Sequence, residues 1–461
     1  MSESDTPEFD IVILGGGSGG YACALRASQL GLSVALIEQA ELGGTCLHRG
    51  CIPTKALLHA AEVADEVRGS DHVGVTSTFS GIDMAKVNKY KESVVARLYK
   101  GLQGLVASRG VTYVAGTGRL VAPNAVEVNG QRYVGRNVVL ATGSYARTLP
   151  GIDIGGLVVT SDQALQLDWI PNQVIVLGGG VIGVEFASVW RSFGSEVTIL
   201  EALPSLVPSE DASSSKALER AFRKRGIKFS TGVRVMSVSQ NSQGVDVTME
   251  NGDTYHAELL LVAVGRGPNS AGMGYEEQGI AMDRGFVLTD ERLRTNVPGV
   301  FAVGDIVPGL QLAHRGFAQG IFVAEEVAGL APAVLDEKGI PRVTYCEPEV
   351  ASVGYNENEA REHFGADNIE SVEYNLGGNG KSQILGTAGF IKLVRQKDGP
   401  VVGVHMVGSR VGEQIGEAQL IFSWEAYPED VAVLLHAHPT QNEAMGEAHM
   451  ALAGKPLHAH G

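Results

Sequence analysis

The chain of 461 residues is poor in positive charge, in aromatic side chains and in cysteine. Its 36 Lys and Arg against 52 Asp and Glu give a net charge of −16, which argues against a nucleic-acid partner. No apolar run is long enough to span a membrane, and residues 1–5 are acidic where a targeting peptide would be basic. We therefore expect a cytoplasmic protein that binds neither membrane nor nucleic acid.

Glycine is abundant where aromatic residues are scarce. The chain has 60 glycines and 44% hydrophobic residues with only 6% aromatics, a composition typical of α/β layers with tight turns. The length suffices for about three domains, each with its own core.

Two of the four cysteines, Cys46 and Cys51, lie five positions apart. A regular helix would hold their Cα atoms about 8.6 Å apart, beyond the roughly 7 Å that a disulfide bridges, so a bond requires a bent segment. Gly50 supplies the freedom to bend. Lys55 and the start of a following helix favour the thiolate form, so we interpret the pair as a redox-active disulfide.

Other roles for the cysteines stay open at this point. The pair could be inert buried thiols, or a zinc site completed by His48 and His59, although that spacing is unusual and we predict no metal site. Cys23 and Cys346 lack a partner cysteine nearby and are expected to serve packing.

A dinucleotide-binding fingerprint begins the chain. The apolar run 9–14 predicts a buried parallel strand that leads into Gly15-x-Gly17-x-x-Gly20 and then a helix. A second strand ends in Glu38, eighteen residues after Gly20, where a carboxylate can accept ribose hydroxyls. Strand, glycines, helix and acid in register favour a nucleotide site over a plain tight turn.

The same unit recurs in the middle of the chain. Strand 173–177 leads into Gly178, Gly180 and Gly183, and the next strand ends in Glu201, again eighteen residues after the last glycine. A carboxylate there repels a 2′-phosphate, and residues 202–205 contain no arginine to bind one. Two fingerprints predict two nucleotides, and the second favours NAD over NADP.

Further strands are expected at 138–143, 260–265 and 300–305, the last ending in Asp305, which could accept a ligand hydroxyl or cap a turn. After about residue 340 the pattern becomes antiparallel, with a hairpin of segments 388–394 and 401–407. Helices are then predicted over 412–424, 428–436 and 442–453.

His438 lies between the last two helices, with Glu443 five residues further on. Such a pair can be a general base oriented by a carboxylate, and it can equally be a helix cap or a surface contact.

Taken in order, the two fingerprints, Gly-Gly-Thr-Cys-x4-Cys-x3-Lys from Gly43, Ala-Thr-Gly at 141–143, the Asp305 strand and His-Pro-Thr-x2-Glu from His438 resemble the flavin disulfide reductases over essentially the whole chain. The resemblance implies an α/β fold with two Rossmann-like domains, for FAD and NAD, and a C-terminal α+β dimerisation domain. The expected boundaries are 1–150 for the first part of the FAD domain, 151–270 for the NAD domain, 271–340 for the completion of the FAD domain, and 341–461 for dimerisation.

The resemblance also implies residue roles. Cys51 is the flavin-proximal sulfur and Cys46 the thiol that exchanges with substrate, while His438 with Glu443 acts as the base on the cysteines of the other subunit of a homodimer. Lys55, paired with Glu185, lies near the flavin. The cofactor-binding residues implied are Gly15, Gly17, Gly20, Glu38, Gly44, Thr45, Lys55, Gly118, Thr142, Gly143, Ser144, Asp305, Ala313, Gly178, Gly180, Gly183, Glu185, Glu201 and Gly265.

The activity implied is oxidation of dihydrolipoamide on a lipoylated protein, with NAD as acceptor. The expected partners are a lipoylated acyltransferase of a 2-oxoacid dehydrogenase complex or a glycine cleavage H protein. An NAD(P)H-dependent reductase of another low-molecular-weight disulfide is the alternative, and a subunit that keeps FAD only for stability is a third reading. His48, Arg49, Thr54 and Ser18 depart from the family pattern, and we expect a cation beside the cysteines to favour thiolate.

Overall fold

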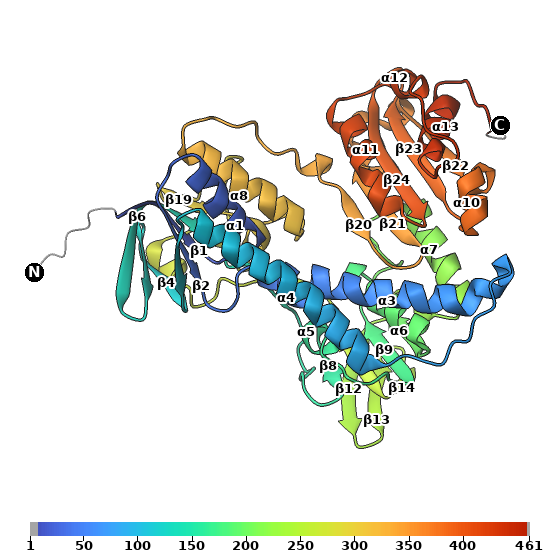
Figure 1. Ribbon diagram of the computed structural model, residues 1–461, viewed down its shortest axis with the longest axis horizontal. Coiled ribbons are helices and arrows are strands. Elements are labelled where there is room, and N and C mark those ends of the chain that lie inside the picture. The colour runs from blue at the N-terminus through green and yellow to red at the C-terminus, as the bar shows by residue number, and fades with distance from the viewer. Residues whose placement is uncertain (1–7, 459–461) are drawn as a thin grey trace, which may run out of the picture.

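The computed structural model describes residues 8–458, arranged as two units built around parallel strands and a C-terminal unit with an antiparallel sheet (Figure 1). The first sheet has the order β3-β2-β1-β6-β5-β4, and β19 pairs in parallel with β6. Its strands are β1 (Phe9–Leu14), β2 (Val34–Glu38), β3 (Thr112–Ala115), β4 (Gly118–Ala122), β5 (Ala125–Val128), β6 (Gln131–Leu140) and β19 (Val300–Ala302). A strand from residue 300 thus completes a sheet begun at residue 9, which brings the Asp305 segment beside the first fingerprint.

Helices α1 (Ser18–Gln29) and α8 (Ala313–Val327) pack side by side against this sheet (Figure 1). The apolar faces of β1 and β2 are buried with Cys23, Ala24 and Val323 in one core. This packing fixes the N-terminal end of α1 at the carboxyl edge of the parallel strands, where ligands of open α/β sheets bind.

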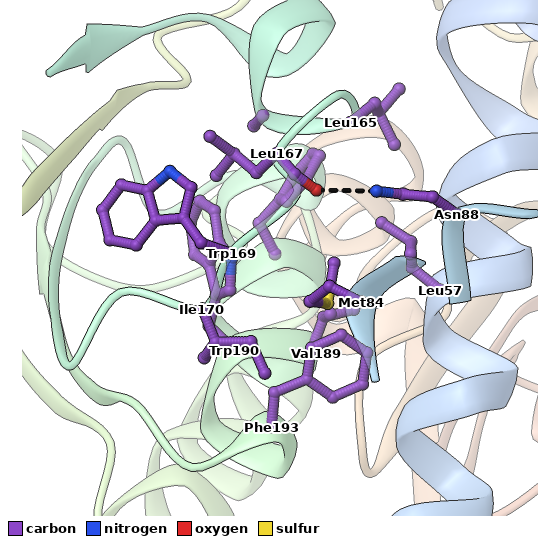
Figure 2. Close-up of a pocket in the computed structure, with 12 residues that line it drawn as sticks. Leu57, Met84, Asn88, Leu165, Leu167, Trp169, Ile170, Val189, Trp190 and Phe193 are labelled. Atoms are coloured by element: carbon purple, nitrogen blue, oxygen red, sulfur yellow. Dashed lines mark hydrogen bonds between the residues drawn. The ribbon is translucent and has the colours of Figure 1, made fainter. Parts of the chain in front are cut away.

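Three helices connect the first two units: α2 (Gly44–Arg49), α3 (Cys51–Gly69) and α4 (Met84–Ser108). Helix α3 packs on α6 (Val181–Phe193), which belongs to the second unit. Figure 2 shows the apolar side chains at this junction, which include Leu57 of α3, Met84 of α4 and Trp190 of α6 and leave only a small gap of about 10 Å³. The amide of Asn88 donates to the carbonyl of Leu167 at 2.9 Å on its rim. The junction therefore holds the cysteine-bearing helices against the second nucleotide unit.

The second sheet has the order β11-β10-β9-β15-β8 and is parallel. It repeats the β3-β2-β1-β6 part of the first sheet, in which β4, β5 and β6 pair antiparallel. Its strands are β8 (Val158–Val159), β9 (Gln173–Leu177), β10 (Glu196–Leu200), β11 (Lys228–Ser230) and β15 (Leu259–Val262), with α5 (Ser161–Ala164) and α7 (Ala212–Arg225). A small antiparallel sheet of β12 (Val235–Asn241), β13 (Gly244–Met249) and β14 (Thr254–Ala257) was not predicted, because much of β12 is polar and exposed. Short pairs join β7 (Ser144–Ala146) to β16 (Arg266–Pro268) and β17 (Met282–Asp283) to β18 (Phe286–Val287).

The C-terminal unit is an antiparallel sheet of order β20-β21-β24-β23-β22. It comprises β20 (Arg342–Thr344), β21 (Glu349–Gly354), β22 (Ile369–Asn375), β23 (Phe390–Gln396) and β24 (Val401–Gly408), with helices α9 (Glu357–Phe364), α10 (Gly380–Leu385), α11 (Val411–Ser423), α12 (Pro428–Ala432) and α13 (Glu443–Leu452). The β23–β24 hairpin and helices α11 and α13 confirm the sequence prediction. The predicted helix 428–436 is too long, because the chain leaves helical geometry after Ala432 and exposes Val433, Leu434 and Leu435.

In the part of the chain that the structure describes, no helix combines the length and apolarity that crossing a membrane requires. The expected fold class is confirmed: two βαβ units with parallel strands are followed by a C-terminal α+β unit with an antiparallel sheet.

Candidate active site

The two cysteines lie on either side of a break between helices. Cys46 is in α2, Cys51 is the first residue of α3, and Gly50 between them has φ −147° and ψ −107°. A Cβ at Gly50 would lie 3.0 Å from the carbonyl oxygen of Thr45, so a side chain there would press on the helix that carries Cys46. The bend expected from Gly50 is therefore present.

All four cysteines are unbridged in this structure, and Cys23 and Cys346 are buried. A hydrogen bond from the Cys46 thiol lowers the pKa of Cys51, against the effect of burial, and the positive charge of Lys55 lowers it further. The same hydrogen bond and burial raise the pKa of Cys46. Of the two cysteines, Cys51 is therefore the one whose thiolate form is favoured.

Lys55 forms an ion pair at the inner side of the cysteines. Its Nζ lies 3.0 and 2.9 Å from the two carboxylate oxygens of Glu185, which is buried on α6. Burial lowers the pKa of Lys55 and the charge and hydrogen bonds of Glu185 raise it by more, so the ammonium stays charged. The backbone N–H of Tyr345 donates to Glu185 Oε1 at 2.9 Å.

One cavity of about 200 Å³ joins these groups to the first fingerprint. Its lining contains the N-terminal turn of α1, both cysteines, the Lys55–Glu185 pair and the end of β19. Predicted site residues in that lining are Gly17, Thr45, Cys46, Cys51, Lys55, Gly143, Ser144, Glu185, Asp305 and Ala313. A second, smaller cavity of about 30 Å³, at the carboxyl ends of β1 and β2, is lined by Gly15, Glu38, Gly118 and Thr142.

The two fingerprints have nearly the same local geometry. Gly15 and Gly178, the first glycine of each, have φ of +110° and +111°, a region that favours glycine. A Cβ at either residue would lie within 2.4 Å of a backbone carbonyl oxygen. The loops can therefore turn sharply into the N-termini of α1 and α6, where a pyrophosphate binds in such units.

The acid that ends the second strand of each unit holds the glycine loop. Glu38 accepts from the N–H of Gly16 at 2.7 Å and of Ala40 at 2.8 Å. Glu201 accepts from the N–H of Gly179 at 2.5 Å and of Leu203 at 2.7 Å. Gly20, Gly44, Gly180, Gly183 and Gly265 lie in or beside these loops or strand ends, at the positions predicted for them.

Arg266, Ser144 and Asp305 form a chain of hydrogen bonds that fixes the Asp305 carboxylate. A carboxylate held in this way suits a ligand rich in hydroxyl groups. Ser144 Oγ donates to Asp305 Oδ2 at 2.5 Å, and Arg266 Nε donates to the same Ser144 Oγ at 2.7 Å. Arg266 also donates to the Ser144 carbonyl at 2.8 Å. Glycine-lined turns, a helix N-terminus and an anchored carboxylate fit the ribityl and pyrophosphate parts of FAD, so these residues can hold that cofactor.

His438 and Glu443 form the predicted pair. His438 Nδ1 lies 2.8 Å from Glu443 Oε1, and the N–H of Thr440 donates to the other carboxylate oxygen at 2.7 Å. Burial raises the pKa of Glu443, but the hydrogen bonds from Thr440 and His438 outweigh it and the net pKa is lowered. Within this chain, neither residue belongs to the described lining of the cysteine cavity, and the side chain of His438 is 78% exposed. The structure leaves this pair facing outward beside the exposed residues 433–435.

Residues that the motifs did not indicate also face the site. Arg266 and Gln311 line the cavity, and Tyr345 contacts the Lys55 pair. Their only signal is position: Arg266 follows Gly265 at the end of a buried strand. Tyr21 of α1 lies near the two cysteines as well. Burial, and to a lesser degree Cys46 and Cys51, raise the pKa of its hydroxyl to about 12.

The two unusual basic residues of the cysteine loop, His48 and Arg49, lie differently from each other. His48 is turned away, with Nε2 2.8 Å from the carbonyl oxygen of Leu42 and Nδ1 3.3 Å from Glu41. Arg49 lines the cavity. The positive charge of Lys55 lowers the pKa of Cys51, as its place after the cysteines led us to expect.

The chain belongs to the pyridine nucleotide-disulphide oxidoreductase family. The family model matches residues 9–320, and the model of the family's dimerisation domain matches residues 340–449.

Among the relatives, the dihydrolipoyl dehydrogenase of Bacillus subtilis (strain 168) is 39% identical over 98% of this chain and 99% of the relative. The mitochondrial dihydrolipoyl dehydrogenase of Pisum sativum is 39% identical over 99% of this chain and 93% of the relative. The crystal structure of LpdA from Mycobacterium tuberculosis superposes with a TM-score of 0.89 at 27% identity, covering 96% of this chain and 99% of that one. The family confirms the expected fold class and the expected cofactors, FAD and NAD.

Proposed function

We propose that the chain is a dihydrolipoyl dehydrogenase, which oxidises the dihydrolipoamide of a lipoylated protein with NAD as acceptor. The observation that carries this proposal is the Cys46–Cys51 pair at the helix break, with Lys55 lowering the pKa of Cys51 inside the cavity of the first fingerprint. Full-length similarity to the Bacillus subtilis and Pisum sativum enzymes supports the same substrate.

The substrate dithiol meets the Cys46–Cys51 disulfide. His438 takes a proton from one substrate thiol, and the thiolate attacks Cys46 Sγ, which breaks the bond to Cys51 and leaves Cys51 as thiolate. The second substrate thiol then displaces Cys46, which closes the substrate's own disulfide. Two electrons have passed from the substrate to the cysteine pair, and the substrate's two protons are shared between the reduced cysteines and the base.

Gly17, Ser144 and Asp305 would hold FAD, which would supply the electron transfer from the reduced cysteines to NAD. The net reaction is dihydrolipoamide plus NAD⁺ to lipoamide, NADH and one proton. The chain's own part is to hold Cys51 as thiolate through Lys55 and to place NAD on the second fingerprint. Glu201 there disfavours the 2′-phosphate of NADP.

We infer a homodimer in which His438 of one chain serves Cys46 of the other. The pair His438–Glu443 faces outward, and it lies next to Val433, Leu434 and Leu435, of which Leu435 is fully exposed. Exposed contiguous apolar side chains are typical of an interface. The match to a dimerisation domain supports this arrangement.

The lipoylated partner is an acyltransferase of a 2-oxoacid dehydrogenase complex or a glycine cleavage H protein, and the compartment is the cytoplasm. These assignments follow from the proposed activity. The net charge of −16 agrees with a protein that binds no nucleic acid.

Steady-state assay of the purified protein tests the proposal. NADH should form from dihydrolipoamide and NAD, at a much lower rate with NADP, and Cys46→Ser or Cys51→Ser should abolish it. The matched control is Cys23→Ala, which changes a buried cysteine away from the cavity and should retain the rate. A protein that reduces glutathione-type disulfides with NAD(P)H, and does not turn over dihydrolipoamide, would instead be a reductase of another disulfide.

A further inference from the structure

A short strip of the C-terminal unit, residues 345–347, docks on the helix of the second fingerprint. The N–H of Tyr345 donates to Glu185 Oε1 at 2.9 Å, and the N–H of Glu347 donates to Ser188 Oγ at 3.0 Å. Residues 185 and 188 lie one turn apart on α6, so two alternate amides of the strip meet one face of the helix.

Arg225 secures the strip from the other side. Its guanidinium donates to the carbonyl of Glu347 at 2.9 Å and to Ser188 Oγ at 2.7 Å. The contacts of Glu347 therefore help to fix the position of Tyr345, together with the contacts that Tyr345 makes itself.

The side chain of Tyr345 contacts the other member of the ion pair. Lys55 Nζ lies over the ring of Tyr345, 4.6 Å from its centroid, a distance at which the negative face of the ring attracts a cation. One residue thus holds both partners: its backbone binds the Glu185 carboxylate and its ring binds the Lys55 ammonium. Among the described residues, no hydrogen bond involves the Tyr345 hydroxyl, so the ring face is the group that acts.

Lysine has a flexible stem of four carbons and a mobile point charge. Glu185 alone fixes the ammonium from one side. The Tyr345 ring supplies the second contact, which limits the positions that the charge can take relative to Cys51.

We propose that Tyr345 is a positioning residue that holds the Lys55 ammonium beside Cys51, and so links the dimerisation unit to the redox cysteines. The inference rests on the proposed function, because it assigns a role within the same redox site. The charged groups that face Lys55 are Cys51 from α3 and Glu185 from α6, and those that act on Tyr345 are Lys55, Glu349, Glu185 and Glu413.

The test is the pH titration of the Cys51 thiolate in FAD-loaded protein reduced with one equivalent of dithionite. A thiolate beside oxidised flavin gives a long-wavelength absorbance band, so its growth with pH reports the Cys51 ionisation. In Tyr345→Leu the ammonium is less well held, and the midpoint should rise by about half a pH unit or more, roughly a threefold change in the ionisation constant. Tyr345→Phe keeps the ring and should titrate as the wild type.

A matched control exists in the same unit. Lys338 Nζ lies 4.8 Å from the ring centroid of Tyr355, which lies outside the lining of the cysteine cavity, so Tyr355→Leu removes an equivalent contact and should leave the titration unchanged. If Tyr345→Leu does not fold, pentafluorophenylalanine in place of Tyr345 keeps the ring's shape, reverses its face charge and should raise the midpoint.

An unchanged or lowered midpoint in Tyr345→Leu, or in the fluorinated variant, overturns the inference. Reduction by dithionite separates this result from the proposed function. If the wild-type protein forms the band with dithionite but is not reduced by dihydrolipoamide, the substrate assignment is overturned. The role of Tyr345 is then still decided by the pH titration. A wild type that forms no band overturns both.

Discussion

His438 Nδ1 lies 2.8 Å from Glu443 Oε1, and this carboxylate is itself fixed by the N–H of Thr440. The ring is therefore oriented while its Nε2 side faces out of the chain. Such an arrangement makes a base available to a neighbouring molecule rather than to the cysteines of its own chain.

His438→Ala should lower kcat with dihydrolipoamide by about 10²- to 10⁴-fold, the usual contribution of a general base. Glu443→Gln should cost less, because the ring stays and loses only its orientation. The control is His59→Gln, which changes an exposed histidine paired with Glu62 at 3.2 Å on α3. Retained activity in His438→Ala, with normal FAD content, would contradict the assignment.

Mixed dimers extend this prediction to the subunit arrangement. A heterodimer of one Cys46→Ser chain and one His438→Ala chain contains one intact site if the histidine serves the other subunit, and its activity should be about half that of the wild type. If each histidine served its own chain, both sites would be damaged and the heterodimer would be inactive. Separately tagged chains, purified as the mixed species, allow the measurement.

Gly50→Ala should disturb the cysteine pair. The new Cβ would lie 3.0 Å from the Thr45 carbonyl oxygen, so α2 must shift relative to α3, and overpacking of this kind costs about 1–3 kcal/mol. We expect at least a roughly tenfold loss of activity and slower reoxidation of the thiols. Gly101→Ala on α4 meets no atom within 4 Å and should keep activity and gain slightly in stability. Equal behaviour of the two variants would show that the break does not position the cysteines.

Glu201→Gln should weaken the preference for NAD. The carboxylate accepts from Gly179 and Leu203 and presents negative charge where a 2′-phosphate would lie. Its neutralisation should lower the ratio of kcat/KM for NAD to that for NADP by about tenfold. Glu38→Gln removes the matching charge from the first fingerprint, with the same two kinds of N–H contact, and should leave the ratio unchanged. A ratio that moves equally in both variants would contradict the assignment of the two sites.

Acid should destabilise the fold through His449. Burial lowers its pKa from 6.5 to about 4, although the hydrogen bond to Met445 opposes this. As the pH falls, the unfolded chain binds a proton at His449 before the folded chain does. The free energy of unfolding is therefore unaffected by His449 above about pH 6.5 and decreases as the pH drops to about 4. The whole decrease due to His449 is about 3 kcal/mol. Urea unfolding at pH 7.5 and 5.0, at one protein concentration, should show a smaller loss in His449→Gln than in the wild type. An equal loss of unfolding free energy in the two proteins would contradict the role of His449.

Local sequence signals predicted the parts of the site that lie within single turns. The glycine loops, Glu38, Glu201 and the bend at Gly50 depend on neighbours within a few residues or on one βαβ unit, so spacing was enough. Arg266 and Tyr345 carry no such signal, because their partners Ser144 and Glu185 are far away in sequence and only the fold brings them together. The helix predicted to His436 ended at Ala432 for a related reason: the apolar residues after it find no cover within this chain. The proposed domain boundaries stay a prediction.

The most direct test of the account is anaerobic titration of the FAD-loaded protein with dihydrolipoamide, followed by NAD or NADP. The account predicts that dihydrolipoamide produces the long-wavelength thiolate band and that NAD, far better than NADP, removes it with formation of NADH. A normal flavin spectrum that dihydrolipoamide does not change would contradict the account, since the cysteine pair would then have no electron path from that substrate.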